Sequence, residues 1–533
     1  MRTIIAILSM SIAYAGGSLP WKQRFCVSQN TTSNTSTFYP LPIPTVWGGA
    51  IPSVGQSYCD PVFGTQVLRL TDDADNYQLA ALQVGAFSNY LAADGSISSR
   101  AWVMVSTSHG DIKFFDFNPV TFTTTGTATA FAPLDPGGTP IVAGLQRELA
   151  MWWSNDTSDP NYQSTVVFTA GMKLWKMDLL GNGRSVLLAD WSTYACSGCT
   201  LNIPIPPGGT GVNNLTYCTA SADTRIFWCA VQDNTIFAGR GFLWFKLGNT
   251  TAPAGACPNA GLCVVAKFIQ GVDSGSVSTP LTVPCKVSTF DTFTYCYVLY
   301  SDVNVVGYKY EMDKTGTWIY AVINGSLSST TNPSGLLGGL NTTAVISSAD
   351  AAIVANPLAT DWTTVAYKWA QGLGHGTSGN NHRYGIEGGY ICSNCMRDYV
   401  SATLTTDPGN FVPANIGVLV SPVFGFGMAE NIFLGSYGGP EITINTYGAG
   451  NRFAGDPLGF IKWRNEVLWC DFAGSTCLRS AHTREAYTGT FEDEGHIVKS
   501  PDGKYAATGT AWDTNVSGAA GIIRSVMIVR RPN

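Results

Sequence analysis

A short phrase recurs along this chain: an apolar, aromatic-rich segment of strand character that stops at a polar or charged residue. The clearest copies are 113–116, 175–178, 310–313 and 468–471, and weaker copies are 243–247, 395–398 and 527–530. Successive copies end about 60 to 85 residues apart, a period typical of architectures built from one small sheet per repeat. Seven copies therefore predict seven small β-sheets.

One small sheet cannot keep both of its faces dry, whereas a ring of sheets encloses a continuous core and leaves few open strand edges. We therefore predict an all-β fold, a single seven-bladed β-propeller over residues 59–533, with six or eight blades as alternatives. A strand at 67–70 precedes the first complete repeat, and a strand at 525–529 comes last. We expect the first strand to complete the last blade and so to join the two ends of the ring.

The first fifteen residues have the pattern of a secretory signal peptide. Arg2 gives the positive start, residues 4–12 form the apolar stretch, and Ala13-Tyr14-Ala15 forms a small-x-small cleavage site. Residues 16–58 are rich in proline, serine and threonine, which predicts an N-terminal arm. No later apolar stretch is long and uninterrupted enough for a membrane span. We expect a secreted, extracellular, soluble protein with no membrane partner.

The low charge content also narrows the choice of partners. Charged residues make up 12% of the chain and the formal net charge is −6. Phosphate binding needs a basic face, and the sequence has no lysine and arginine cluster, so we expect no nucleic-acid partner. We also expect the protein to be a monomer. Glycans would add solubility where charge is scarce. The candidate N-glycosylation sites, each in an Asn-x-Ser/Thr sequon, are Asn30, Asn34, Asn155, Asn214, Asn249, Asn324, Asn341 and Asn515.

All 14 cysteines follow the expected cleavage site, and an even number in an oxidising compartment predicts seven disulfides. Equal separations within two candidate hairpins, and short separations elsewhere, favour local pairing. The expected pairs are Cys26–Cys59, Cys196–Cys199, Cys218–Cys229, Cys257–Cys263, Cys285–Cys296, Cys392–Cys395 and Cys470–Cys477. A zinc or redox role for the two Cys-x-x-Cys pairs is the weaker alternative.

Three segments together resemble a known family. They are Cys59 to Asp72, Tyr90 to Gly95, and His496 to Tyr505, the last of which contains Ser-Pro-Asp-Gly-Lys. This pattern is similar to the TolB-type propeller family, which includes oligogalacturonate lyases, over residues 59–530. The resemblance implies a propeller fold. In the lyase branch it further implies a divalent metal held by histidines near the ring axis, and cleavage of polyuronate chains by β-elimination.

The five histidines are the natural candidates for such chemistry, because imidazole is both a common metal ligand and an acid or base near neutral pH. His375 and His382 lie in a segment rich in glycine and asparagine, and His496 follows an acidic stretch. The functional interpretation is a shared site in which His375, His382 and His496 hold a divalent ion such as Mn or Ca. In that site His375 and His382 exchange protons and Arg383 pairs with a substrate carboxylate. The alternative is that these histidines have structural roles, as we expect for His109 and His482.

Two functions from different classes follow. The first is a polysaccharide lyase acting on an acidic, uronate-containing polysaccharide. The alternative is a non-catalytic secreted propeller that binds a glycan or a protein on its face. The sequence discriminates poorly between them. Convergence of His375, His382 and His496 at the axial mouth, with a carboxylate and Arg383 nearby, favours the enzyme, and scattered positions favour the binding module.

Overall fold

The fold is described from a computed structural model of the chain. The described residues are 26, 52–71, 77–78, 86–92, 94–107, 111–145, 150–193, 214–233, 238–248, 265–270, 285–287, 294–296, 310–324, 326–327, 341–348, 367–371, 376–378, 383–387, 395–398, 441–446, 466–471, 476–483, 497–510 and 525–532. Within these ranges the secondary structure is almost entirely β-strand, with one short 3-10 turn at Tyr162–Ser164. No helix among them is long and apolar enough to cross a membrane.

The described strands form eight antiparallel sheets, which we number in chain order. Sheet 1 contains β3 (Tyr77–Gln78), β4 (Ala101–Thr107), β5 (Ile112–Phe117) and β6 (Ala128–Ala130). Sheet 2 contains β7 (Met151–Trp153), β8 (Thr165–Ala170), β9 (Lys173–Asp178) and β10 (Ser185–Asp190). Sheet 3 contains β11 (Asn214–Ala220), β12 (Ile226–Asp233), β13 (Ala238–Lys246) and β14 (Val265–Gln270). Sheet 4 contains β17 (Tyr310–Met312), β18 (Trp318–Asn324), β20 (Asn341–Ser347) and β21 (Tyr367–Gln371).

The remaining sheets have three described strands each, except sheet 7, which has five. Sheet 5 contains β22 (Gly376–Ser378), β23 (Arg383–Glu387) and β24 (Cys395–Asp398). Sheet 6 contains β25 (Glu441–Thr446), β26 (Glu466–Asp471) and β27 (Thr476–His482). Sheet 7 has the order β1 (Ser57–Cys59), β2 (Gln66–Arg69), β30 (Ser525–Arg530), β29 (Tyr505–Thr510), β28 (Ile497–Lys499). An accessory sheet contains β15 (Cys285–Val287), β16 (Thr294–Cys296) and β19 (Ser326–Leu327).

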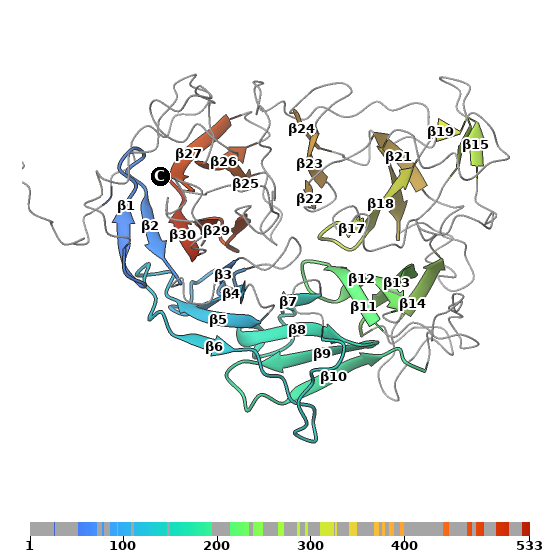
Figure 1. Cartoon of the computed structure of the whole chain (residues 1–533), viewed down its shortest axis with the longest axis horizontal. Helices are drawn as coiled ribbons and strands as arrows, with labels where there is room; N and C mark the ends of the chain where they lie inside the picture. Colours follow the sequence, from blue (N-terminus) through green and yellow to red (C-terminus); the bar gives the residue numbers. More distant parts are fainter. Residues whose placement is uncertain are drawn as a thin grey trace, which may run out of the picture.

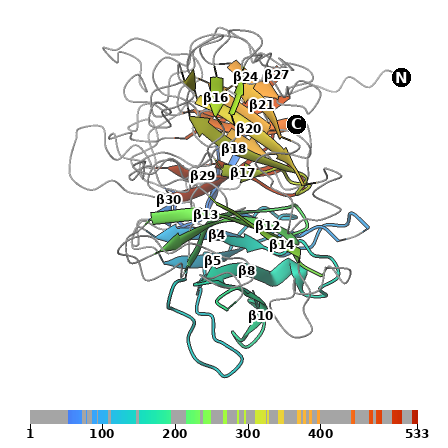
Figure 2. The same ribbon diagram turned by 90° about the vertical axis from the view of Figure 1, so that its right-hand side faces the viewer.

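Sheets 1 to 7 follow one another in chain order around a common centre, and the accessory sheet lies outside sheet 4 (Figure 1). The side view shows sheets 1 to 3 in the lower half of the molecule and sheet 4 in the upper half (Figure 2). The expected pairing of the first and last strands is present, because β2 pairs with β30. The Leu70 amide also donates to the Val526 carbonyl at 2.9 Å. Two distant parts of the chain therefore share one sheet.

The core lies between neighbouring sheets, so strands are apolar on both faces instead of alternating. All six residues of β8 are buried, for example. Ring contacts join successive sheets: Phe117 meets Tyr505 at 5.2 Å between centroids, Phe114 meets Trp153 at 5.3 Å, and Trp152 meets Phe227 at 5.4 Å. These contacts link sheets 7 and 1, 1 and 2, and 2 and 3, which explains why the chain is rich in aromatic residues.

The sequence repeat maps onto the sheets with one copy in each of sheets 1 to 7 and none in the accessory sheet. Five copies fall on the third strand of their sheet in chain order, if the N-terminal strands of sheet 7 are set aside. The copy ending at Asp313 falls on β17, the first strand of sheet 4, and the copy ending at Asp471 falls on β26, the middle strand described in sheet 6. The repeat therefore marks sheets correctly but does not mark equivalent strands.

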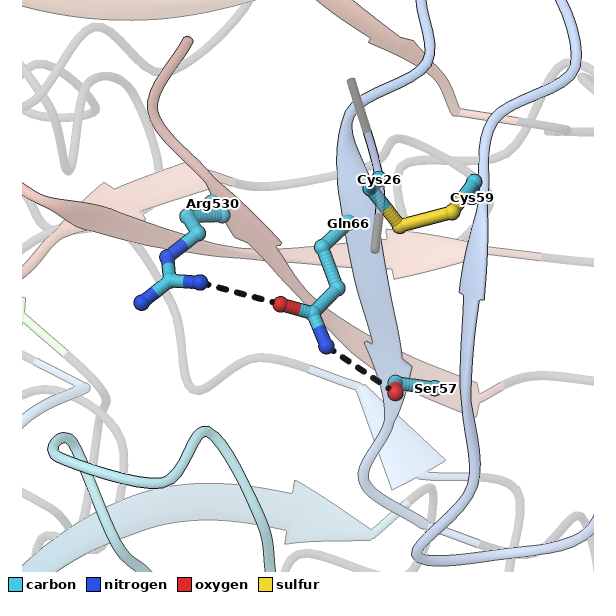
Figure 3. The surroundings of a disulfide bond; sticks show 5 residues. All are labelled: Cys26, Ser57, Cys59, Gln66 and Arg530. Carbon is cyan, nitrogen blue, oxygen red and sulfur yellow. Dashed lines mark hydrogen bonds between the residues drawn. A yellow bond between two sulfur atoms is a disulfide. The ribbon is translucent and has the colours of Figure 1, made fainter. Parts of the chain in front are cut away.

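Two of the expected disulfides are confirmed. Cys26 and Cys59 are bonded with Cα atoms 5.4 Å apart, and Cys218 and Cys229 are bonded across the β11–β12 hairpin. Figure 3 shows the first of these beside a row of side chains in which Gln66 joins Ser57 to Arg530. The Gln66 amide nitrogen donates to Ser57 Oγ, and its Oε1 accepts from Arg530 Nη1, both at 3.1 Å. This row ties β1, β2 and β30 together.

For two further cysteine pairs the strand register agrees with the expectation. Cys285 lies directly opposite Cys296, and Cys470 lies directly opposite Cys477. Directly opposed positions on antiparallel strands have Cα separations that suit a disulfide. The bonds themselves stay predictions, as do those of the pairs that fall wholly or partly outside the described residues: Cys196–Cys199, Cys257–Cys263 and Cys392–Cys395.

Candidate functional site

Most of the side chains proposed from the sequence are not among those that the structure describes. His109, His375, His382 and His496 lie outside the described residues. Arg383 is the first residue of β23 and pairs in register with Ser378, the last residue of β22. The proposed histidine cluster and its metal therefore stay predictions.

His482 is the one described histidine, and it belongs to a buried cluster where sheets 6 and 7 meet. The carboxylate of Asp60, in the turn after β1, accepts from three backbone amides and contacts one ring nitrogen. Its Oδ1 accepts from the backbone amides of Val62 at 2.9 Å and Phe63 at 3.0 Å. Its Oδ2 accepts from the His482 amide at 3.0 Å and lies 3.2 Å from His482 Nδ1. The carboxylate thus joins residues that are 422 positions apart in the chain.

An ion pair completes the same cluster. Arg479 donates from Nε to Glu466 Oε2 at 2.7 Å and from Nη2 to Oε1 at 2.5 Å. The Phe63 ring lies between the two basic side chains, 4.9 Å from the His482 ring and 5.4 Å from the Arg479 guanidinium carbon. A bidentate arginine–carboxylate pair fixes both groups in orientation as well as in distance.

An aspartate bonded to a histidine is also the arrangement expected of a catalytic dyad, but this one has no access to a substrate. Asp60 and His482 are each 1% exposed, and Arg479 and Glu466 are fully buried. Groups that exchange protons with a substrate must come within hydrogen-bonding distance of it. We therefore assign the cluster a structural role, in which the turn at 60–65 is anchored against sheet 6.

A second recurring feature, which was not predicted from the sequence, is a hydrogen-bonded turn after the first described strand of five sheets, with β1 and β2 set aside. The turns are 88–102, 154–165, 221–226, 313–318 and 500–505, and we call the end of the molecule that they form the turn face. In each turn the first residue's amide donates to the last residue's carbonyl at 2.8 to 2.9 Å. In four of them, Ser88, Ser221, Asp313 or Ser500 also accepts from the last residue's amide through its side chain. A serine or aspartate at turn position one is the signal that would have revealed this repeat.

Neighbouring turns bond to one another across the sheet boundaries. Tyr90 Oη donates to Asp502 Oδ1 at 2.6 Å between sheets 1 and 7, and Tyr162 Oη donates to the Leu91 carbonyl at 2.7 Å between sheets 2 and 1. The two remaining bonds join sheets 2 and 3, from the Asn155 amide to Thr224 Oγ1, and sheets 3 and 4, from the Ala222 amide to the Lys314 carbonyl. These four bonds fix the turn face, so it suits a scaffold better than a binding surface that must adapt to a ligand.

Burial and charge perturb a few titrating groups on the same face. Burial, followed by the Asp502 carboxylate, raises the pKa of Tyr90 above its ordinary value of 10.0. Partial burial opposes ionisation of Asp159, but the hydrogen bonds from Lys176 and from the Asn161 amide, together with the Lys176 charge, leave the pKa of that carboxyl lowered. Both shifts come from structural contacts between turns and strands. The described residues contain no group of three potential metal ligands.

The structure separates two of the expected glycosylation sites. Asn155 lies in the turn between β7 and β8 and is partly exposed, with an exposed Thr157 two residues later. Asn214, in contrast, begins β11 and is 1% exposed. A glycan needs solvent around its asparagine, so the exposure favours Asn155 over Asn214, and both sites stay predictions. Asn324 and Asn341 are register partners on β18 and β20, and Asn30, Asn34, Asn249 and Asn515 lie outside the described residues.

Comparison with known proteins gives only remote structural similarities. No protein-family model matches the chain, and no curated protein matches it in sequence. Among solved structures, an oligogalacturonate lyase from Vibrio parahaemolyticus has a TM-score of 0.39 and 9% identity, covering 90% of this chain and 99% of its own. The β-propeller domain of the trilobed protease from Pyrococcus furiosus has a TM-score of 0.35 and 7% identity, covering 81% and 92%.

A third solved structure, the PQQ-bound aldose sugar dehydrogenase from Streptomyces coelicolor, has a TM-score of 0.29 and 10% identity, covering 73% and 94%. At these TM-scores and sequence identities the similarities do not define the fold, and the strand pairing of this chain does. The strand pairing defines an all-β protein of small antiparallel sheets whose first and last strands share one sheet.

Proposed function

We propose that this protein is a secreted, monomeric, seven-bladed β-propeller that acts as a lyase on an acidic polysaccharide. Three observations support seven blades. Sheets 1 to 7 each carry one copy of the sequence repeat, the accessory sheet carries none, and β2 completes the sheet that holds β30. The two confirmed disulfides and the sequons suit an oxidising, glycosylating route to the outside of the cell.

The observation that carries the catalytic part is where two of the candidate histidines fall in the order of strands. His375 immediately precedes β22, and His496 immediately precedes β28. Each of these strands is the first described strand of its sheet in chain order once β1 and β2 are set aside. In the proposed ring of four-stranded antiparallel sheets, all first strands run the same way, because each sheet ends at the side where the next begins. We therefore expect residues just before first strands to gather at one mouth of the ring, opposite the turn face.

We assign the chemistry within this proposal as follows. An imidazole of the group His375, His382 and His496 removes the proton beside a uronate carboxyl, and the electron pair of that C–H bond forms a double bond to the neighbouring carbon. The glycosidic bond at that carbon breaks, its electrons leave with the sugar oxygen, and that oxygen takes up a proton from an imidazolium of the group or from water. Arg383 pairs with the substrate carboxylate. Arg383 lies opposite the far end of β22, about 7 Å along the strand from Gly376, and a polysaccharide is long enough to span that distance. A divalent ion such as Mn or Ca, bound to the three histidines, would neutralise the carboxylate.

One observation favours the alternative, a non-catalytic propeller that binds a glycan or a protein. The Asp60–His482 pair, the only carboxylate–imidazole pair among the described residues, is buried in the scaffold. A binding module requires only the rigid ring and the loops that it carries.

Absorbance distinguishes the two functions. β-Elimination creates a conjugated double bond, so a lyase mixed with polygalacturonate raises the ultraviolet absorbance. Repeating the assay with a chelator shows whether the reaction depends on a metal ion. His375→Ala and His496→Ala are expected to abolish the rise, whereas His109→Ala serves as the matched control and is expected to leave it intact. Co-sedimentation with the polymer and no rise in absorbance over a panel of uronate polymers would establish the binding module instead.

A further inference from the structure

The outer edge of sheet 1 is unusually open. β6, with the sequence Ala128-Thr129-Ala130, is the last strand of the order β3-β4-β5-β6, and all three residues are exposed. It contains no charged residue and no proline, and its pairing with β5 is regular. A strand edge of this kind offers free backbone groups to another chain, and proteins normally protect such edges with charges, prolines, bulges or covering segments.

Other outer edges in the described part of the chain carry such protection. β10 has a register shift between Leu187 and Ala189, and Leu134 bridges to Arg184 just before that strand. β14 carries Lys267. β1 lies beside the Cys26–Cys59 disulfide (Figure 3). β6 therefore lacks a feature that its counterparts have.

The threonines around β6 divide into two groups by their hydroxyl contacts. Thr124 and Thr125 donate to Asp116, and the hydroxyls of Thr121 and Thr123 bond to each other at 2.7 Å. The hydroxyls of Thr127 and Thr129 are exposed and bond to no other residue of the described chain. These two lie on the same side of the strand, about 7 Å apart, and their neighbours Gly126, Ala128 and Ala130 are small.

We propose that Thr127 and Thr129 are sites of O-linked glycosylation, and that the sugars protect the open edge of β6. In the transfer, Oγ1 of the threonine attacks the anomeric carbon of an activated sugar, either a sugar nucleotide or a lipid-linked sugar phosphate. The bond from that carbon to the phosphate oxygen breaks, the phosphate leaves with its electron pair, and the hydroxyl proton passes to the transferase. An extended, accessible strand with small neighbours leaves room for that enzyme at Thr127 and Thr129. The hydroxyls of Thr124 and Thr125 are instead held in hydrogen bonds to Asp116.

The inference rests on the secretory route of the proposed function but not on lyase activity. A bulky hydrophilic group beside a strand edge blocks the approach of a second strand, as an edge lysine does. Glycosylation would then keep the protein monomeric even though few charged residues are available for this purpose. The same modification on a buried threonine such as Thr169 would be incompatible with the fold.

The test is site mapping on full-length protein collected from the medium of a eukaryotic host. Electron-transfer fragmentation of the peptide that contains residues 121–130 is expected to place added hexose or N-acetylhexosamine mass on Thr127 and Thr129. Thr127→Ala and Thr129→Ala each remove one of these additions, and Thr121→Ala, which alters an engaged hydroxyl, removes neither. The N-glycan at Asn155, read in the same digest, reports separately whether the protein used the secretory route.

Association completes the test. T127A/T129A is expected to show at least a twofold larger apparent mass by light scattering, and T127A/T129K, which places a charge on the edge, restores the monomer. An unmodified 121–130 peptide in a protein that carries the Asn155 glycan overturns the inference and leaves the proposed function standing. Missing N-glycan and unpaired cysteines would overturn the secretory route itself.

Discussion

Asp60 is the residue on which the contact between sheets 6 and 7 depends most directly. Its carboxylate contacts four nitrogen atoms, two in its own turn and two in His482, and it is 1% exposed. Asp60→Ala leaves these donors buried without an acceptor, so we expect a loss of about 3 kcal/mol in the free energy of unfolding. Urea denaturation of the variant and the wild type measures this loss. The control is Asp94→Ala, which removes a similar turn bond to the Ser96 amide at an exposed site. Equal losses in the two variants would contradict the anchoring role.

Tyr90 gives the molecule a predictable response to alkali. Burial and Asp502 raise the pKa of Tyr90 in the folded state above the 10.0 of an unfolded chain. The folded state therefore holds this proton more tightly, and the stability it contributes is complete below pH 10 and is lost as the pH rises further. Above pH 10 the stability of the wild type should fall more steeply than that of Tyr90→Phe, by about 1.4 kcal/mol per pH unit. Urea midpoints from pH 9 to 12 measure this. Parallel pH profiles for the two proteins would show that Tyr90 is not the responsible group.

At the scale of elements, the turns of the turn face act as contacts between sheets and not only as chain reversals. Gly316, in the turn between β17 and β18, has a φ of +74°, and a Cβ there would lie 2.6 Å from Cδ1 of Ile226 in sheet 3. Gly95 has a similar φ of +79° but open space around it. Both alanine variants incur backbone strain of about 1 kcal/mol, and Gly316→Ala adds a steric clash worth about 1 to 3 kcal/mol. The unfolding temperatures of the two variants separate the backbone strain from the steric clash. Equal decreases in unfolding temperature would mean that the turn does not pack on Ile226.

How far the sequence predicts the elements depends on the kind of signal. The repeat marks seven of the eight described sheets, because apolar strands that end in polar residues are local and periodic. It does not mark equivalent strands, since the copies ending at Asp313 and Asp471 fall on other strands of their sheets than the remaining five. The repeat of first turns is hard to predict from the sequence because the chain inserts different lengths between equivalent ends: Ser221 and Ile226 are joined across a tight turn, whereas Ser88 and Trp102 enclose a long one. Periodicity fails where insertions vary, even though the hydrogen bonds are the same.

The candidate site was less predictable, for a different physical reason. In the sequence, Asp60 belongs to the Cys59 to Asp72 segment of the family pattern, and His482 lies just after the candidate pair Cys470–Cys477. Neither position indicates that the two residues meet, since 422 residues separate them and only the pairing of β1, β2 and β30 brings the chain ends together. Cys218–Cys229 was predictable because its partners face each other within one hairpin. Contacts that are local in sequence leave a local pattern, and contacts made by joining the chain ends do not.

At the scale of the whole molecule, the junction between β2 and β30 should control more than its own sheet. Thr71 is buried, and its Oγ1 accepts from the Val526 amide at 2.9 Å. Thr71→Val keeps the shape and leaves that amide unsatisfied, at a cost of about 2 kcal/mol. Because each sheet covers the face of the next, opening this junction uncovers its neighbours too, so hydrogen exchange should accelerate in β12 and β13 as much as in β30. Thr139→Val, on an exposed loop, is the control and should change neither the stability nor the hydrogen exchange of these strands. Faster exchange confined to β30 would mean that the sheets unfold independently and that the chain does not behave as one closed ring.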